Sequence, residues 1–332
     1  MQLTTISQFH AVFHEDGIAR RVENLSPGGD FDAHGIQLQT LPDLGKRLST
    51  FATVNDVHFG EVICGSVSGQ DMGPVFSAEE EDDPYPEVMN AAAIEEIKAI
   101  QADAVLAKGD LTCDGTQEQY HQFLNFYHNA FEDRLHHVRG NHEAYREPVI
   151  ETEKRIKIEL EGVMLLMIDT VRPGLTGGTV FDEDIEWIGD ISQGAQIPVL
   201  VFGHHQIWDP RTAYRSEDYF GIQPDESEKL IALVASQSVI KGYFSGHTHR
   251  NRVRYFTETA DVPWVEVACV KDFPGMWAEY QVFERGILQM NHRINHPKAL
   301  EWSEKTKDMY HGSYHDYALG SLSDRCFVVC RN

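Results

Sequence analysis

The chain of 332 residues contains few cysteines and no Cys-x-x-Cys pair of the kind that holds structural zinc. Its five cysteines are odd in number, which argues against a disulfide-stapled secreted domain and favours a reducing compartment. Cys326 and Cys330 are close enough in sequence to close a small disulfide loop, but we expect two free thiols. The cysteine content therefore predicts a cytoplasmic protein.

Long apolar runs are absent as well. The longest runs, such as Val163–Ile168, are far shorter than the roughly 20 residues that a membrane-spanning helix needs. The first eight residues also lack the basic segment and the apolar stretch of a secretory leader. We therefore expect a soluble protein that does not bind membranes.

Positive charge is the third shortage. The chain has 28 Lys and Arg against 52 Asp and Glu, a formal net charge of −24. Proteins that bind long nucleic acids need a basic surface to displace counterions, so no nucleic-acid partner is expected. A small anionic substrate remains compatible with this charge, because bound divalent cations reverse the local sign of a site.

Patterns of polarity divide the chain into three parts. Residues 1–48 place Gly and Asp turns between short stretches of mixed polarity, which predicts an N-terminal β-rich extension. Residues 49–297 alternate apolar strands with amphipathic helices, which predicts an α/β catalytic domain. Residues 298–332 are too irregular to assign, and we treat them as a C-terminal extension for packing or self-association, with a homodimer as the candidate assembly.

Within the central part the elements can be predicted individually. The predicted strands cover residues 50–54, 104–107, a segment ending at 138, and residues 163–168, 198–202, 240–244 and 264–270. The predicted helices cover residues 87–101, 116–131, 184–192 and 226–235. Residues 60–86, rich in Gly, Ser, Asp and Glu, are expected to be a loop, either a solvated surface segment or the rim of an active site.

Against these shortages, the chain has many potential metal ligands in short clusters that follow predicted strands. Five clusters occur in order: Asp56-Val57-His58, Gly109-Asp110, Gly140-Asn141-His142-Glu143, Gly203-His204-His205 and Gly246-His247-Thr248-His249. Residues two apart on an extended chain point to the same side, so the first and last clusters can each direct two ligands into one small volume. The five clusters together predict a site at one edge of a sheet.

The ligand types indicate a catalytic centre. Carboxylate, amide oxygen and imidazole suit Mn²⁺, Fe²⁺ and Zn²⁺, and no thiolate takes part. Each cluster alone has an ordinary explanation: a histidine is usually a surface or hydrogen-bonded residue, Asp110 can cap a turn, and Asn141 can occupy a left-handed backbone position. Five such clusters in order make coincidence a poor explanation.

This order of motifs resembles that of the calcineurin-like metallophosphoesterase superfamily over about residues 50–250. Within it, the chain looks most like the class III bacterial cyclic nucleotide phosphodiesterases and related glycerophosphodiesterases. The segment Lys108-Gly109-Asp110-Leu111-Thr112 and the doublet His204-His205 carry that finer resemblance. The resemblance implies a four-layer αββα sandwich with a centre of two metal ions, Mn, Fe or Zn, with Mn or Fe favoured.

The resemblance also implies a role for each motif residue. One metal would be held by Asp56, His58, Asp110 and His249, and the second by Asp110, Asn141, His204 and His247. Asp110 would bridge both ions, and His142 would contact the phosphate and protonate the leaving oxygen. His205 is assigned only a place beside the ligands. The two metals would activate a bridging hydroxide in line with the scissile P–O bond.

The expected activity is hydrolysis of phosphodiesters, foremost of 3′,5′-cyclic nucleotides such as cAMP, with a glycerophosphodiesterase or phosphomonoesterase of the same superfamily as the alternative. A non-catalytic scaffold is the remaining possibility, but no ligand position is lost.

Protein Ser/Thr phosphatases have Asp-Arg where this chain has Cys113-Asp114, so the arginine that would hold a phosphomonoester is missing. Purple acid phosphatases have a tyrosine ligand in place of Cys113. Glu143 replaces a more frequent aspartate, with little expected effect because it is not a ligand.

Overall fold

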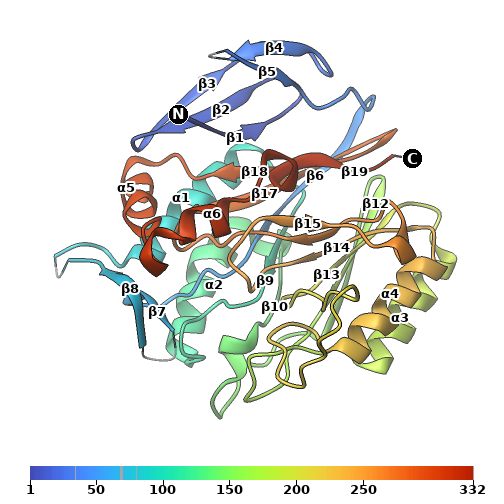
Figure 1. Ribbon diagram of the computed structural model, residues 1–332. Coiled ribbons are helices and arrows are strands. Elements are labelled where there is room, and N and C mark those ends of the chain that lie inside the picture. The colour runs from blue at the N-terminus through green and yellow to red at the C-terminus, as the bar shows by residue number, and fades with distance from the viewer. Residues whose placement is uncertain (34, 68–69, 80, 332) are drawn as a thin grey trace.

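Two six-stranded sheets face each other in the computed structural model, which describes residues 1–33, 35–67, 70–79 and 81–331 (Figure 1). The first sheet has the order β10 (Leu135–Val138), β9 (Ala104–Lys108), β6 (Arg47–Val54), β17 (Met276–Phe283), β18 (Gly286–Arg293) and β19 (Cys326–Arg331). The second has the order β11 (Arg155–Leu160), β12 (Val163–Ile168), β13 (Val199–Phe202), β14 (Ile240–Ser245), β16 (Trp264–Glu266) and β15 (Arg252–Arg254).

Helices cover the outer face of each sheet. Helices α1 (Tyr85–Ala99) and α2 (Gln117–Phe131) pack on the first sheet, while α3 (Asp182–Gly194) and α4 (Pro224–Ser236) pack on the second. Neighbouring residues of a strand point to opposite faces. Phe51 therefore lies between the two sheets and Ala52 lies under the helices, and both are fully buried. The expected αββα sandwich is confirmed.

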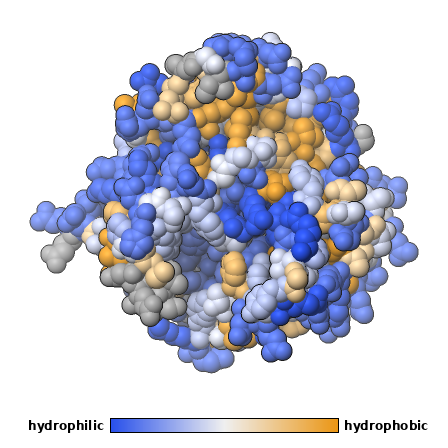
Figure 2. All heavy atoms as spheres, viewed as in Figure 1, coloured by the Kyte–Doolittle hydropathy of each residue, from blue (hydrophilic) through white to orange (hydrophobic). Residues whose placement is uncertain are grey.

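The N-terminal residues form the expected β-rich extension. Strands β1 (Gln2–Ile6), β2 (Ala11–Glu15) and β3 (Ile18–Val22) make an antiparallel sheet, and β4 (Asp30–Ala33) pairs with β5 (Ile36–Gln39) as a hairpin. Phe13 and Leu44 pack there against Leu288 and Met290 of β18. In Figure 2, hydrophobic side chains gather in this upper part of the molecule. The extension thus shares an apolar core with the first sheet.

Residues 60–86, expected to be a loop, contain a hairpin instead. Strand β7 (Ile63–Val67) pairs antiparallel with β8 (Gln70–Ser77), and the pairing is irregular between Cys64 and Ser66, at Gly65, whose φ is 93°. The loop prediction was wrong because the glycines that suggested a flexible segment occupy left-handed positions inside the hairpin, Gly73 at φ 126° being the second. The Glu and Asp run comes after β8.

The C-terminal third also holds elements that the sequence patterns did not identify. Strands β17 and β18 form a long antiparallel pair beside β6, and the strand predicted to run to residue 270 ends at Glu266. The last residues form α5 (Pro297–Thr306), α6 (Tyr314–Leu319) and α7 (Leu322–Arg325), and β19 then joins the first sheet beside β18.

The single-turn helices are η1 (Glu132–Arg134), η2 (Asn141–Ala144), η3 (Thr257–Thr259) and η4 (Tyr310–Gly312). No helix among the described residues has the length and apolar character to cross a membrane.

Candidate metal centre

The five motifs meet where the carboxyl ends of the central strands of both sheets come together. Asp56 follows β6, Asp110 follows β9, and Asn141 opens the η2 turn after β10. These three strands run parallel, so their following loops lie at one edge. From the second sheet, His204 follows β13 and His247 follows the parallel strand β14. The topology alone therefore brings residues that are far apart in sequence into one site.

Four residues form the first cluster of ligand atoms. One atom from each of Asp56, His58, Asp110 and His249 lies within 4.8 Å of the others. His58 Nε2 is 3.6 Å from Asp110 Oδ2, and His249 Nε2 is 3.4 Å from Asp56 Oδ1. We refer to this set as site one.

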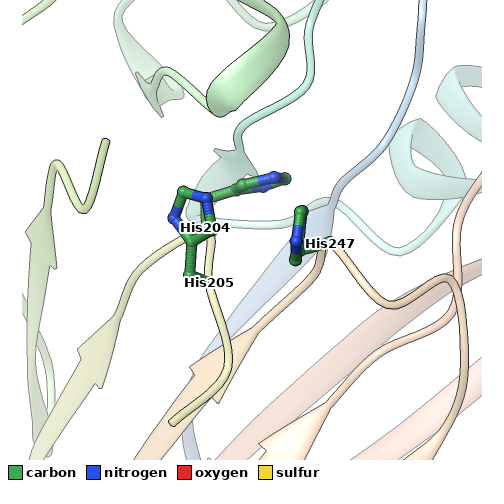
Figure 3. Close-up of side chains that lie close together, drawn as sticks. All are labelled: His204, His205 and His247. Atoms are coloured by element: carbon green, nitrogen blue, oxygen red, sulfur yellow. The ribbon is translucent and has the colours of Figure 1, made fainter. Parts of the chain in front are cut away.

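A second cluster shares Asp110. His204 Nε2 lies 3.3 Å from Asp110 Oδ2 and 3.1 Å from Asn141 Oδ1. The rings of His204 and His247 have their centroids 5.0 Å apart, and Figure 3 shows His204, His205 and His247 converging from the loops after β13 and β14. We refer to Asp110, Asn141, His204 and His247 as site two. Asp110 Oδ2 thus lies between the two sets, as a bridging ligand would.

Hydrogen bonds to backbone carbonyl groups fix the orientation of the His204 and His247 rings. His204 Nδ1 lies 2.8 Å from the Lys108 carbonyl oxygen, and His247 Nε2 lies 2.7 Å from the Phe220 carbonyl oxygen. In each ring the other nitrogen is left for a ligand role, because a carbonyl can accept only from a protonated nitrogen. His205 differs, since Nδ1 contacts the Thr170 hydroxyl and Nε2 contacts the Thr176 carbonyl. Both of its nitrogens are occupied, which suits a supporting role.

The donor set fits metal ions. His58 Nδ1 faces Glu61 Oε2 at 2.9 Å, while the buried Nε2 makes no hydrogen bond with a described residue and is therefore open to a metal ion. Burial raises the pKa of the Asp110 carboxyl, but its interactions with His204, His142 and His58 together hold that pKa well below its usual value. Asp110 is therefore an ionised carboxylate, the state that a metal ligand requires.

Most of the proposed metal ligands also have an unusual backbone conformation. Asp56, His58, Asp110, His247 and His249 all have left-handed backbone, with φ of 52°, 47°, 49°, 66° and 54°. Such conformations are uncommon outside glycine and persist at functional sites where the surrounding structure enforces them. Five of the seven proposed ligands share this feature. The local fold therefore orients the ligands at a cost in backbone energy.

Glycines in the motifs allow the loops to approach one another. A Cβ added at Gly140 would lie 2.2 Å from Asp110 Oδ1, and one at Gly246 would lie 2.7 Å from Asp56 Oδ2. Both distances are below any normal contact, so a side chain at either position would displace a proposed ligand. Both motifs therefore require glycine at the position before the first ligand, because no larger residue fits there.

Three residues behind the ligands hold the motifs together, and one of them, Glu143, was expected from the sequence to have little effect. Glu143 accepts hydrogen bonds of 2.7 Å each from the Thr112 amide, the Thr112 hydroxyl and the Gly140 amide, which joins the second and third motifs. Burial, reinforced by the charge of Asp110, raises its pKa to about 7.

Lys108 and Tyr145 are the other two residues. Lys108 fixes the end of a strand, and Tyr145 fixes the proposed ligand Asn141. Lys108 donates from Nζ to the Ser245 carbonyl at 2.9 Å, linking β9 of one sheet to β14 of the other. Tyr145 accepts from Asn141 Nδ2 at 2.6 Å, which leaves Asn141 Oδ1 facing site two. Glu143 belongs to the third motif and Lys108 directly precedes the second, so the sequence drew notice to both positions but did not reveal their contacts.

The site opens into a cleft of about 280 Å³. Its lining contains five of the seven proposed ligands, all except Asp56 and His204. It also contains residues from other segments, namely Ile63, Gly65 and Ser66 of the β7–β8 hairpin and Tyr145, Thr176, Lys271, Asp272 and Tyr310. The hairpin that replaces the expected loop thus forms part of the rim. A small molecule can reach both sites from this cleft.

Comparison with known proteins identifies the class. The chain belongs to the calcineurin-like phosphoesterase family, whose sequence model matches residues 49–251. No curated protein sequence matches the chain. Among solved structures, a dimetal phosphatase from Danio rerio aligns with a TM-score of 0.56 and 12% identity, covering 76% of this chain and 98% of that one. A purple acid phosphatase isolated from yellow lupin (Lupinus luteus) seeds aligns with a TM-score of 0.49 and 12% identity, covering 83% and 59%.

Family membership fixes the general activity. The protein is a metal-dependent hydrolase of phosphoesters, and the family implies a centre of two metal ions. The similarity to the Danio rerio structure, at this identity, shows a shared fold. The choice of substrate must come from the cleft.

Proposed function

We propose that the protein is a phosphodiesterase that hydrolyses small-molecule diesters, 3′,5′-cyclic nucleotides such as cAMP in particular. The observation that carries this proposal is the charge of the cleft. Lys271 is the only lysine or arginine among the described residues that line it, and its Nζ lies 2.6 Å from Glu61 Oε1 and 3.3 Å from Asp272 Oδ2. No lysine or arginine of the lining is left for the second negative charge of a phosphomonoester, whereas a diester carries one.

The proposed ligands divide as the two clusters do. Asp56, His58, Asp110 and His249, whose ligand atoms cluster, would hold one cation. Asp110, Asn141 and His247, which all lie near His204, would hold the other together with it. Bound there, the cations would supply an activated water and neutralise charge on the phosphoryl oxygens. The carboxylates and imidazoles position the ions, and the cleft positions the ester.

His142 is placed to serve the leaving group. Its Nδ1 lies 2.6 Å from the Cys113 carbonyl oxygen, so Nδ1 carries a proton and the ring is fixed. Its Nε2 is directed to the centre, 3.9 Å from Asp110 Oδ2, and the ring is partly exposed in the cleft. From there Nε2 can give a proton to the alkoxide of a diester, which is a poor leaving group without one. We therefore assign His142 as the general acid.

The preference for cyclic nucleotides rests on the resemblance to class III bacterial cyclic nucleotide phosphodiesterases. The motif Lys108-Gly109-Asp110-Leu111-Thr112 and the doublet His204-His205 support it. A nucleic-acid substrate is disfavoured by the net charge of −24.

Substrate preference can be measured on one panel with Mn²⁺: cAMP, cGMP, glycerophosphocholine, bis(p-nitrophenyl) phosphate and p-nitrophenyl phosphate. We expect kcat/KM for the chromogenic diester to exceed that for the matched monoester by at least about tenfold, a difference of about 1.4 kcal/mol in barrier. Among the biological esters we expect cAMP or cGMP to be cleaved fastest. A faster monoester would overturn the diesterase assignment, and turnover of glycerophosphocholine alone would overturn the cyclic nucleotide assignment.

A further inference from the structure

Behind site one lies a chain of three buried charged residues. Lys271 Nζ contacts Glu61 Oε1 at 2.6 Å and Asp272 Oδ2 at 3.3 Å, and the three side chains are 7%, 9% and 2% exposed. Burying a lysine and two carboxylates is costly, and an apolar cluster of similar volume is often at least as stable. The arrangement therefore calls for an explanation other than stability.

Each of the two carboxylates lies beside one histidine of site one. Glu61 Oε2, the oxygen that does not face Lys271, is 2.9 Å from His58 Nδ1. Asp272 forms a cluster with His249 and Cys269 in which one ligand-type atom from each residue lies within 4.8 Å of the others. Lys271 thus lies between the acidic residues Glu61 and Asp272. Each of the two lies beside an imidazole, that of His58 or His249, which is proposed to bind the metal ion of site one.

The contact of Glu61 with His58 is the more direct one. Glu61 Oε2 and both nitrogens of His58 are buried, so this contact is shielded from solvent. His58 Nε2, on the far side of the ring, lies 3.6 Å from Asp110 Oδ2. A carboxylate at Nδ1 fixes the tautomer of a metal-binding histidine and raises the basicity of the nitrogen that binds the metal.

The C-terminal residues anchor this chain of charges. The Tyr314 hydroxyl donates to Asp272 Oδ1 at 2.8 Å, and the Trp302 indole donates to the Lys271 carbonyl at 3.1 Å. These four residues lie outside the segment 49–251 that matches the family model. The support of site one is therefore supplied partly by the part of the chain that the family match does not cover.

We propose that Glu61, Lys271 and Asp272 are positioning residues for the metal ion of site one. Glu61 holds His58 with Nε2 turned to the ion, and Lys271 holds Glu61 and Asp272 in place while offsetting their charge. Tyr314 connects this support to helix α6. The inference rests on the proposed ligand assignment of site one and is independent of which ester is cleaved.

The test measures metal affinity in the absence of substrate. Full-length wild type and the Glu61→Gln variant are freed of metal with a chelator and titrated with Mn²⁺, and bound ions are counted per chain. We expect the dissociation constant of one ion to rise about 10–100-fold in Glu61→Gln, while the other ion keeps its affinity. The amide retains the size of the side chain but removes the negative charge.

A matched control is available in the sheet. Glu279 Oε2 lies 2.8 Å from His292 Nε2, with side chains 7% and 13% exposed, so Glu279→Gln disturbs a similar buried pair in β17 and β18. This control should bind two Mn²⁺ ions with wild-type affinity. Equal losses of affinity in both variants, or two ions bound by Glu61→Gln with unchanged affinity, would overturn the proposal.

A second variant keeps the proposal testable if Glu61→Gln does not fold. Tyr314→Phe removes only the hydroxyl that donates to Asp272, and we expect it to weaken the same ion by a few-fold. Unchanged affinity in Tyr314→Phe, together with an unfolded Glu61→Gln, would assign the charges to stability alone and contradict a positioning role. Because no ester is present in these titrations, a failed diesterase assignment would not alter their outcome.

Discussion

Replacing Asp110 with alanine is expected to abolish hydrolysis and to lower metal content at both sites. Asp110 Oδ2 lies 3.3 Å from His204 Nε2 and 3.6 Å from His58 Nε2, so one oxygen serves the two ligand clusters. The metal ions contribute several kcal/mol of charge stabilisation in the transition state, so we expect a loss in kcat/KM of about 10³-fold or more. The same change should leave fewer than one tightly bound ion per chain.

The comparison with Asn141→Ala separates bridging from ordinary ligation. Asn141 approaches only the second cluster, with Oδ1 3.1 Å from His204 Nε2, so its removal should weaken mainly one ion. Asp190→Ala, at an exposed position of α3, should change neither metal content nor rate. The metal content and kcat/KM of the three variants show whether Asp110 bridges the two ions. Mild and equal effects from Asp110→Ala and Asn141→Ala would contradict the bridging role.

Replacing His142 with alanine should have a large effect of a different kind. The ring is held by the Cys113 carbonyl at 2.6 Å, and no ligand assignment involves its side chain. We therefore expect close to full metal content and a loss of about 10²–10⁴-fold on cAMP, the usual size of a general acid contribution. On bis(p-nitrophenyl) phosphate the loss should be much smaller, because nitrophenolate leaves without a proton.

The two substrates serve as each other's control for His142→Ala. The ratio of the two losses is independent of protein concentration and of any partial unfolding, since both are measured on one preparation. An equal loss on both esters would remove His142 from the acid role and leave it as a residue that positions the phosphate. Reduced metal content in the variant would also count against the assignment.

That the motif residues come together could be predicted from the sequence, because they stand directly after buried strands. Val54 and Ala107 are fully buried, and Asp56 and Asp110 follow them within three residues. Parallel pairing of β6 and β9 then brings the two loops together without any further signal in the sequence. The four-layer fold could be predicted for the same reason, since alternating strands and helices leave few other arrangements.

Contacts between distant segments could not be predicted in this way. Lys271 meets Glu61 across 210 residues, and nothing in the local sequence of either residue indicates the other. The same holds for β19, which pairs with β18 only because the chain returns to the first sheet after three short helices. The hairpin at residues 63–77 was missed because its left-handed glycines resemble those of a loop.

We expect this chain to hold two metal ions, one at site one and one at site two. The most direct test is to count the metal ions bound to the wild-type protein while its activity is restored. After dialysis against a chelator, the protein should be inactive, and titration with Mn²⁺ or Fe²⁺ should restore hydrolysis as the content approaches two ions per chain. Full activity with one ion or none per chain would contradict the account.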